Sequence, residues 1–174
     1  RQKLKASIMI EGLQGSGKSG LALLIAKALT DDWSKIYAID TENRSLDLFE
    51  GIKMNTGDAF GSFNKVDLTI EDGYAPSNYL ALRDEAIKEG AEVVVMDSIS
   101  HMWNRKGGLL DLVAEAQANG LDNYRSWGTE RNRREKELLN DIVRSKDVHV
   151  ITTVRIKEKF GMEYDETKGK TTVV

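Results

Sequence analysis

The 174-residue sequence contains no cysteine, a single proline and only two histidines. The absence of cysteine excludes disulfides, thiolate zinc sites and a cysteine nucleophile. His101 and His149 leave little room for a histidine-based metal site. The longest apolar run, residues 21–26, is far below the ~20 residues of a membrane-spanning helix, and the apolar part of the basic N-terminal segment is too short for a signal peptide. We therefore expect a cytoplasmic protein without a membrane partner.

Charge of neither sign dominates, because 25 Lys and Arg stand against 28 Asp and Glu, for a formal net charge of −3. Any contact with nucleic acid must therefore come from a local basic patch rather than from the field of the whole molecule. Hydrophobic residues make up 40% and charged residues 30%, which is typical of a globular protein. The length predicts one domain over residues 1–174. Because the chain begins at Arg1 without methionine and ends on a strand-like TTVV, we expect it to be a fragment of a longer product, incomplete at its C-terminus.

Short apolar segments alternate with helical patterns along the chain. Strands are expected at residues 4–10, 36–40, 66–70, 91–97 and 148–154, and helices at residues 18–29, 76–90 and 108–146, the last broken near Gly120. The first strand is expected to be buried, and residues 93–96 are apolar on both faces, which is typical of a central parallel strand. This alternation predicts an α/β fold, with a mostly parallel twisted sheet and helices on both faces.

A glycine-rich segment follows the first expected strand. Residues 12–19 read GLQGSGKS and match the phosphate-loop pattern G-x-x-x-x-G-K-[ST] at every fixed position. Lys18 is expected to bridge the β- and γ-phosphates, and the Ser19 hydroxyl to bind magnesium. A chance glycine-rich turn is the alternative, which the flanking strand and helix disfavour. The predicted ATP contacts are Gly12, Gln14, Gly15, Ser16, Gly17, Lys18, Ser19 and Gly20.

Two carboxylates follow expected strands. Asp97 ends the apolar run of residues 93–96 and is the candidate magnesium ligand, unless it only caps the next helix. Hydrolysis also needs a group that orients or deprotonates water. Ser98 occupies the position after Asp97, where many P-loop ATPases carry a glutamate, so the base must come from elsewhere. Glu42 is the candidate, because it follows a strand at the sheet edge where ligands bind; the alternative is a solvated loop residue.

Residues 64–67 read NKVD and match the guanine-reading pattern of GTPases. In GTPases this pattern follows the magnesium-binding D-x-x-G segment, whereas here it precedes Asp97. The segment after Asp97 also lacks the glycine. We therefore interpret residues 64–67 as a coincidental match.

Together these segments resemble the RecA-like ATPases, and in particular the small bacteriophage RecA-like proteins linked to single-strand annealing. The resemblance is carried by the phosphate loop, by residues 39–42, by residues 93–98 and by residues 149–157, with the sequence DSISHMW at 97–103 favouring the phage group. It implies a RecA-like core in which the strand that precedes the phosphate loop and the strand that ends at Asp97 have one other strand between them in the sheet. It also implies that Glu42 activates water and that Asp97 is the Walker B residue. Thr153 stands where RecA has a glutamine that senses the γ-phosphate.

The resemblance further implies a function: ATP binding and hydrolysis, with magnesium, coupled to single-stranded DNA binding and annealing in recombination in a bacterial host cell. Its implied partners are further copies of the chain in a ring or filament, single-stranded DNA and a single-strand DNA-binding protein. Arg155 and Lys157 are candidates for groups that act on a neighbouring subunit or face DNA. Two alternatives stay open: a small P-loop kinase for a nucleotide or metabolite, and a nucleotide-dependent switch with negligible turnover.

Basic and aromatic residues gather in the C-terminal half, as Arg125, Trp127, Arg131, Arg133, Arg134 and Lys136. They fit a single-strand binding surface, or the lid of a kinase, or a solvated helix face with pairs such as Glu130–Arg134. A second basic group comprises Lys157, Lys159, Lys168 and Lys170. His101 is expected in a loop, and Trp33 and Trp103 are expected to be packing residues.

Overall fold

The computed structural model describes residues 4–53, 59–156, 162–165 and 170–173. Five parallel strands form the main sheet, in the spatial order β1-β5-β4-β2-β3. The strands are β1 (Ser7–Gly12), β2 (Ile36–Asp40), β3 (Asn64–Asp67), β4 (Val93–Asp97) and β5 (His149–Arg155). The predicted α/β fold with a parallel sheet is confirmed. One strand, β5, lies between β1 and β4, as the resemblance implies.

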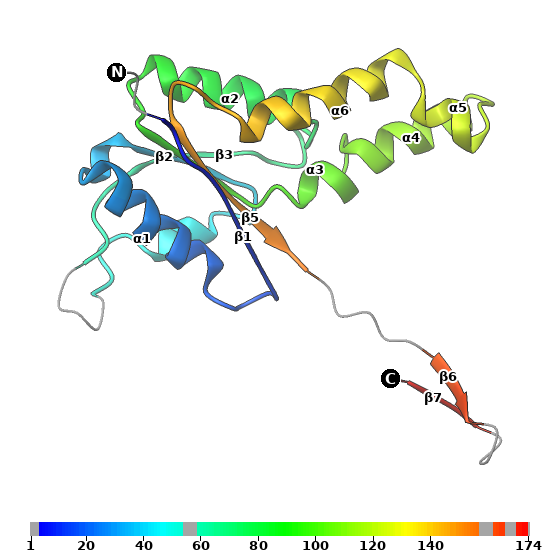
Figure 1. Ribbon diagram of the computed structural model, residues 1–174, viewed down its shortest axis with the longest axis horizontal. Coiled ribbons are helices and arrows are strands. Elements are labelled where there is room, and N and C mark those ends of the chain that lie inside the picture. Colours follow the sequence, from blue (N-terminus) through cyan, green and yellow to red (C-terminus); the bar gives the residue numbers. More distant parts are fainter. Residues whose placement is uncertain (1–3, 54–58, 157–161, 166–169, 174) are drawn as a thin grey trace.

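Helices cover both faces of this sheet (Figure 1). They are α1 (Lys18–Thr30), α2 (Pro76–Lys88), α3 (His101–Asn104), α4 (Leu109–Ala118), α5 (Asn123–Trp127) and α6 (Glu130–Val143), with short 3-10 helices η1 (Trp33–Lys35) and η2 (Ser45–Leu48). β6 (Met162–Asp165) and β7 (Lys170–Val173) pair antiparallel in a separate two-stranded sheet, which confirms the strand expected at the C-terminal end. Within the described ranges, no helix has the length and apolar character needed to cross a membrane.

Two apolar clusters hold the helices against the sheet. On one face, α1 contributes Leu23, which packs with residues such as Ile36 and Ile151. On the other face, α2 and α6 contribute Tyr79 and Ile142 to a cluster that includes strand residues. Every residue of β4 is buried, as expected for the strand between two helical layers. The parallel strands therefore end at one edge, where the loops after β1, β2, β4 and β5 meet.

Three sequence predictions need correction. β1 is an edge strand rather than a buried one, and its exposure alternates, because the face that carries Ser7, Met9 (57% exposed) and Glu11 is less covered than the other. β3 spans residues 64–67 rather than 66–70, since pairing with β2 fixes its limits. The helical region 108–146 breaks at Gly120, as predicted, but also at Gly128, which ends α5.

Candidate functional site

A cavity of about 570 Å³ opens beside the phosphate loop, at the carboxyl edge of the sheet. It gathers side chains from four separate parts of the chain. Its lining comprises Gln14, Gly15, Gly17, Lys18, Ser19, Glu42, Asn43, Ser45, Phe49, Asp97, Ser98, Arg105 and Arg155. We call it the loop cavity. The fold therefore brings the candidates Lys18, Ser19, Glu42 and Asp97 together, although up to 79 residues separate them in sequence (97 minus 18).

The phosphate loop owes its shape to glycines. Gly15 and Gly17 have φ angles of 78° and 81°, in the left-handed region that glycine adopts without strain. α1 then begins at Lys18, so its unpaired N-terminal N–H groups point towards the loop. A Cβ at Gly12 would lie 2.6 Å from the Ser16 hydroxyl, so a larger residue there would require the Ser16 side chain to move.

Lys18 is folded back over this loop and is buried. Its Nζ donates to the Leu13 carbonyl at 2.6 Å and lies 3.5 Å from the Ser16 hydroxyl. These partners are one neutral carbonyl and one hydroxyl, and no carboxylate of the described residues pairs with the ammonium group. The positive charge of Lys18 is therefore available for an anion in the loop cavity.

Asp97 lies at the end of β4 and is 3% exposed. Its Oδ1 accepts a hydrogen bond from the Thr153 hydroxyl on β5, whereas its Oδ2 is buried and has no hydrogen-bond partner among the described residues. A buried carboxylate oxygen without a donor is costly unless a cation or water satisfies it. Oxygen ligands of this kind suit Mg²⁺, and the Ser19 hydroxyl lines the same cavity. The residues present therefore fit a magnesium ion.

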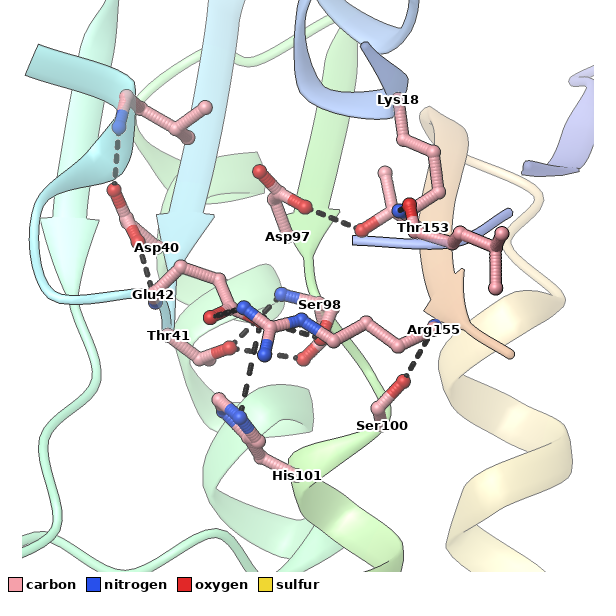
Figure 2. A network of polar contacts seen from close by, with 12 residues as sticks. Lys18, Asp40, Thr41, Glu42, Asp97, Ser98, Ser100, His101, Thr153 and Arg155 are labelled. Atoms are coloured by element: carbon pink, nitrogen blue, oxygen red, sulfur yellow. Dashed lines mark hydrogen bonds and ion pairs between the residues drawn. The ribbon is translucent and has the colours of Figure 1, made fainter. Parts of the chain in front are cut away.

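Glu42 follows β2 and contacts three side chains (Figure 2). Its Oε1 accepts from the Ser98 hydroxyl at 3.1 Å, and its Oε2 forms an ion pair with the Arg155 guanidinium. His101 Nε2 lies 3.8 Å from Oε1, beyond hydrogen-bond distance. Burial raises the pKa of Glu42, while Arg155 and Ser98 act in the opposite direction. A carboxylate with a raised pKa is the stronger proton acceptor.

Backbone and side-chain bonds hold the Glu42 segment in place. Asp40 accepts the N–H groups of Glu42 at 2.6 Å and of Leu46 at 2.8 Å, which fixes the turn after β2. Thr41 exchanges hydrogen bonds with the backbone of Ser98, donating to its carbonyl and accepting from its N–H. The ends of β2 and β4 are thereby joined directly, and the separation of Glu42 from Asp97 is fixed.

A second cavity, of about 560 Å³, lies beside Glu42 and shares Glu42, Asn43 and Arg105 with the loop cavity. We call it the side cavity. Its other lining residues are Asp40, Thr41, Arg44, Asp67, Leu68, Thr69, Ile70, Glu71, Tyr74 and His101. His101 Nδ1 is buried there without a hydrogen-bond partner in the described chain. Burial lowers the pKa of His101, and the charges of Arg105 and Arg155 lower it further.

Several predicted residues lie away from the loop cavity. Gly20 faces Phe49, and a Cβ there would come within 3.0 Å of the ring. Thr153 is buried behind Asp97 and contacts its carboxylate. Gly12 and Ser16 shape the loop but do not line the cavity. His101 is the first residue of α3 rather than a loop residue.

The NKVD segment forms β3, where Lys65 makes an ion pair with Asp47. Asn64 donates to the Ser34 carbonyl at 2.8 Å. The side chains of Asn64 and Lys65 therefore make contacts with other residues of the same chain. Lys157, Lys159 and Lys168 lie outside the described residues, as does the side chain of Lys170.

The basic and aromatic cluster is divided between α5 and α6. Arg131 pairs with Glu115 at 3.2 Å, and among the ion pairs of the described residues none joins Glu130 to Arg134. Arg131, Arg133 and Arg134 line neither cavity. Trp33 packs against Phe60 and Phe63, as expected. Trp103 stacks on Trp127 but is 49% exposed.

Sequence reasoning missed Asp40, Ser45, Phe49, Asn43 and Arg105 as site residues. Asp40 carried a signal, because it ends a strand in the same way as Asp97. The other four lie in loops or, for Ser45, in the short 3-10 helix η2, where the sequence has no periodic pattern. Arg155 was expected to act on another subunit or on DNA, whereas the structure places it on Glu42 of its own chain.

A parallel sheet whose first strand leads through a glycine loop into a helix, with a strand-end aspartate beside that loop, defines a P-loop nucleotide-binding protein. A family model described as an AAA domain matches residues 4–173. Since this match covers nearly the whole chain, the protein belongs to that family of P-loop ATPases, which use ATP and Mg²⁺. No curated protein matches the chain.

Proposed function

We propose that this protein hydrolyses ATP in the loop cavity and couples hydrolysis to the binding and annealing of single-stranded DNA in recombination. One observation carries the hydrolytic part. Glu42 and Asp97, from adjacent strand ends, line the same cavity as Lys18 and Ser19. A water-activating carboxylate, a metal-binding carboxylate and a phosphate-binding lysine are the groups that this reaction requires.

ATP binding is the first step. The N–H groups of the loop and of the α1 N-terminus receive phosphate oxygens, and the helix dipole favours their negative charge. Lys18 exchanges the Leu13 carbonyl for oxygens of the β- and γ-phosphates. The Ser19 hydroxyl and the free Oδ2 of Asp97 are the groups that would hold magnesium. When bound, the metal neutralises charge on the phosphate oxygens.

Glu42 acts in the second step. Its carboxylate takes a proton from water as the water oxygen bonds to the γ-phosphorus, and the bond from that phosphorus to the β–γ bridging oxygen breaks. Ser98 and the Asp40–Glu42 turn orient the carboxylate. The positive charge of Arg155 restrains the basicity of Glu42 while the two are paired. An incoming γ-phosphate competes for Arg155, and the exchange frees Glu42 to accept the proton.

The DNA-related part rests on the resemblance to phage RecA-like proteins and on the local basic and aromatic residues. Oligomerisation in a ring or filament, and contact with a single-strand DNA-binding protein, belong to the same proposal. The test is ATP hydrolysis by the full chain with and without an oligo-dT strand. We expect hydrolysis that increases with DNA; no hydrolysis under either condition contradicts the proposal.

One observation favours a second candidate function, phosphoryl transfer to a hydroxyl-bearing small molecule. The side cavity meets the loop cavity at Glu42, so an acceptor held there would place its hydroxyl between the carboxylate and the γ-phosphate. Such a kinase should release ADP only when an acceptor is present. A panel of nucleosides and other alcohols, assayed without DNA, distinguishes the two functions, because an ATPase releases phosphate in the absence of every acceptor.

A further inference from the structure

An exposed aromatic group lies outside both cavities. Trp103 on α3 is 49% exposed and Tyr124 on α5 is 90% exposed. The rings of Trp103 and Trp127 stack with centroids 5.9 Å apart and an interplanar angle of 30°. Tyr124 and Trp127 also line an open hollow of about 640 Å³. Large aromatic side chains gathered at a surface are typical of binding sites.

Positive charge lies beside these rings. Lys136 Nζ is 4.3 Å from the centroid of the Trp127 ring. Arg133 lies three residues before Lys136 on α6, and therefore on the same side of that helix. Arg125 and Arg131 pair with acidic side chains, but within the described residues neither Arg133 nor Lys136 forms an ion pair. Neither charge is therefore neutralised by a carboxylate of the described residues, although the Lys136 ammonium lies over the Trp127 ring.

We propose that Trp103, Tyr124, Trp127, Arg133 and Lys136 form a docking surface for single-stranded DNA, called here the aromatic surface. Aromatic faces stack on unpaired bases, while nearby cations bind the phosphates between them. Duplex DNA offers no free base face, because its bases already stack on one another. The inference rests on the proposed function, since it locates the DNA that the ATPase is proposed to engage.

The aromatic surface is connected to the loop cavity through α3. Trp103 lies two residues after His101, whose ring lies 3.8 Å from Glu42. Ser100, the residue before His101, accepts a hydrogen bond from the backbone N–H of Arg155 through its hydroxyl oxygen, at 2.8 Å. A DNA strand that shifts Trp103 and α3 therefore also shifts His101, which faces Glu42, and the N-cap residue Ser100, which bonds to the Arg155 backbone. This connection predicts that DNA docking changes the rate of ATP hydrolysis.

The test is titration of the full chain with oligo-dT, followed by tryptophan fluorescence and by the anisotropy of a labelled strand. We expect quenching in the wild type and in Trp33→Phe, since the partly buried Trp33 packs against Phe60 and Phe63 rather than against the aromatic surface. Trp103→Ala should weaken affinity by roughly 5- to 160-fold, the loss of one stacked base. Tyr124→Ala, at a side chain too exposed to support the fold, should also weaken it, and Trp103→Phe should retain most of the affinity. Log affinity falls with log salt, and Arg133→Ala should make this negative slope shallower by about 0.7, the contribution of one phosphate contact.

Basal hydrolysis without DNA, measured on the same samples, separates the two proposals. Wild-type affinity in both Trp103→Ala and Tyr124→Ala, with hydrolysis intact, overturns the aromatic surface and leaves the ATPase standing. If DNA affinity depends on Trp103 but the wild-type chain does not hydrolyse ATP, the aromatic surface stands and the proposed ATPase activity is rejected. Failure of the wild type to bind the strand rejects the surface. Stimulation of hydrolysis by DNA in the wild type, and its loss in Trp103→Ala, is the expected sign of coupling.

Discussion

The same strands build two regions of the sheet from different residues: its interior from apolar side chains and its carboxyl edge from polar ones. In β4, four buried apolar residues precede Asp97, which is equally buried. In β5, Ile151 packs in the α1-side cluster, whereas Thr153, two residues later, bonds to Asp97. Buried polar groups cost stability unless they are bonded, and those at the edge bond mainly to one another. Changes in the interior should therefore affect folding, and changes at the edge should affect the reaction.

The largest effect is expected for Lys18→Ala. This change removes the charge that faces the phosphates, so ATP affinity should fall by roughly 100-fold or more, and productive binding should be lost. The thermal midpoint should stay close to that of the wild type, because Lys18 bonds only within its own loop. A fluorescent ATP analogue reports the binding. Lys27→Ala, on the same helix but paired with exposed Asp31, is the control and should bind normally.

Ile151→Ala tests the interior. Ile151 is fully buried, and removal of its side chain beyond Cβ should reduce the free energy of unfolding by about 2–5 kcal/mol. The folded fraction should still bind ATP with near-normal affinity. Urea unfolding measures the stability, and ATP titration at low temperature measures the binding. A variant of unchanged stability would contradict the assignment of β5 to the core.

Thr153→Val tests the carboxyl edge of the sheet on β5, the strand that also carries Ile151. Valine has nearly the shape of threonine but leaves Asp97 Oδ1 without its donor. We expect turnover to fall by about tenfold, and stability by about 1–3 kcal/mol, the cost of an unsatisfied group. Turnover at several magnesium concentrations is the measurement. Thr153→Ser restores the hydroxyl and should restore activity; equal losses in both variants would mean that only packing matters at this position.

The smallest effect concerns His149, at the start of β5. Its Nδ1 accepts the Ala6 N–H at 2.9 Å, which requires a neutral ring, and burial lowers its pKa. A histidine with a lowered folded pKa contributes stability that is present above its unfolded pKa of about 6.5 and lost as the pH falls through the folded value. In His149→Asn the amide oxygen can accept the same N–H without titrating. The loss of thermal midpoint between pH 7.5 and 5.5 should therefore be smaller in the variant, by about 2 °C or less.

The apolar interior of the fold was largely predictable from sequence. Runs such as residues 93–96 have no stable location other than a sheet covered on both faces, and the glycine at 120 interrupts a helix because it favours left-handed φ. β3 was displaced in the prediction because an edge strand of four mixed residues has no strong pattern. Its limits depend on the register with β2, which only the folded chain sets.

The site was predictable where chemistry is encoded in local spacing. The phosphate loop was found for that reason, and Glu42 and Asp97 were found because each follows a strand. The pairing of Glu42 with Arg155 was not predictable, since 113 residues separate the two. The hydrogen bond from the Thr153 hydroxyl to Asp97 was not predictable either, because it forms only when β4 and β5 lie next to each other. Such contacts depend on strand order, which spacing along the chain does not encode.

The role of Glu42 as the base is tested most directly by comparing ATP binding and a single turnover in wild type and in Glu42→Gln. Glutamine retains the size of the side chain and can still accept from Ser98, but it cannot take a proton from water. We expect Glu42→Gln to bind ATP with an affinity close to that of the wild type and to hydrolyse it at a rate reduced by roughly 10²–10⁴. Hydrolysis at the wild-type rate by Glu42→Gln would contradict the central claim that Glu42 is the base in the loop cavity.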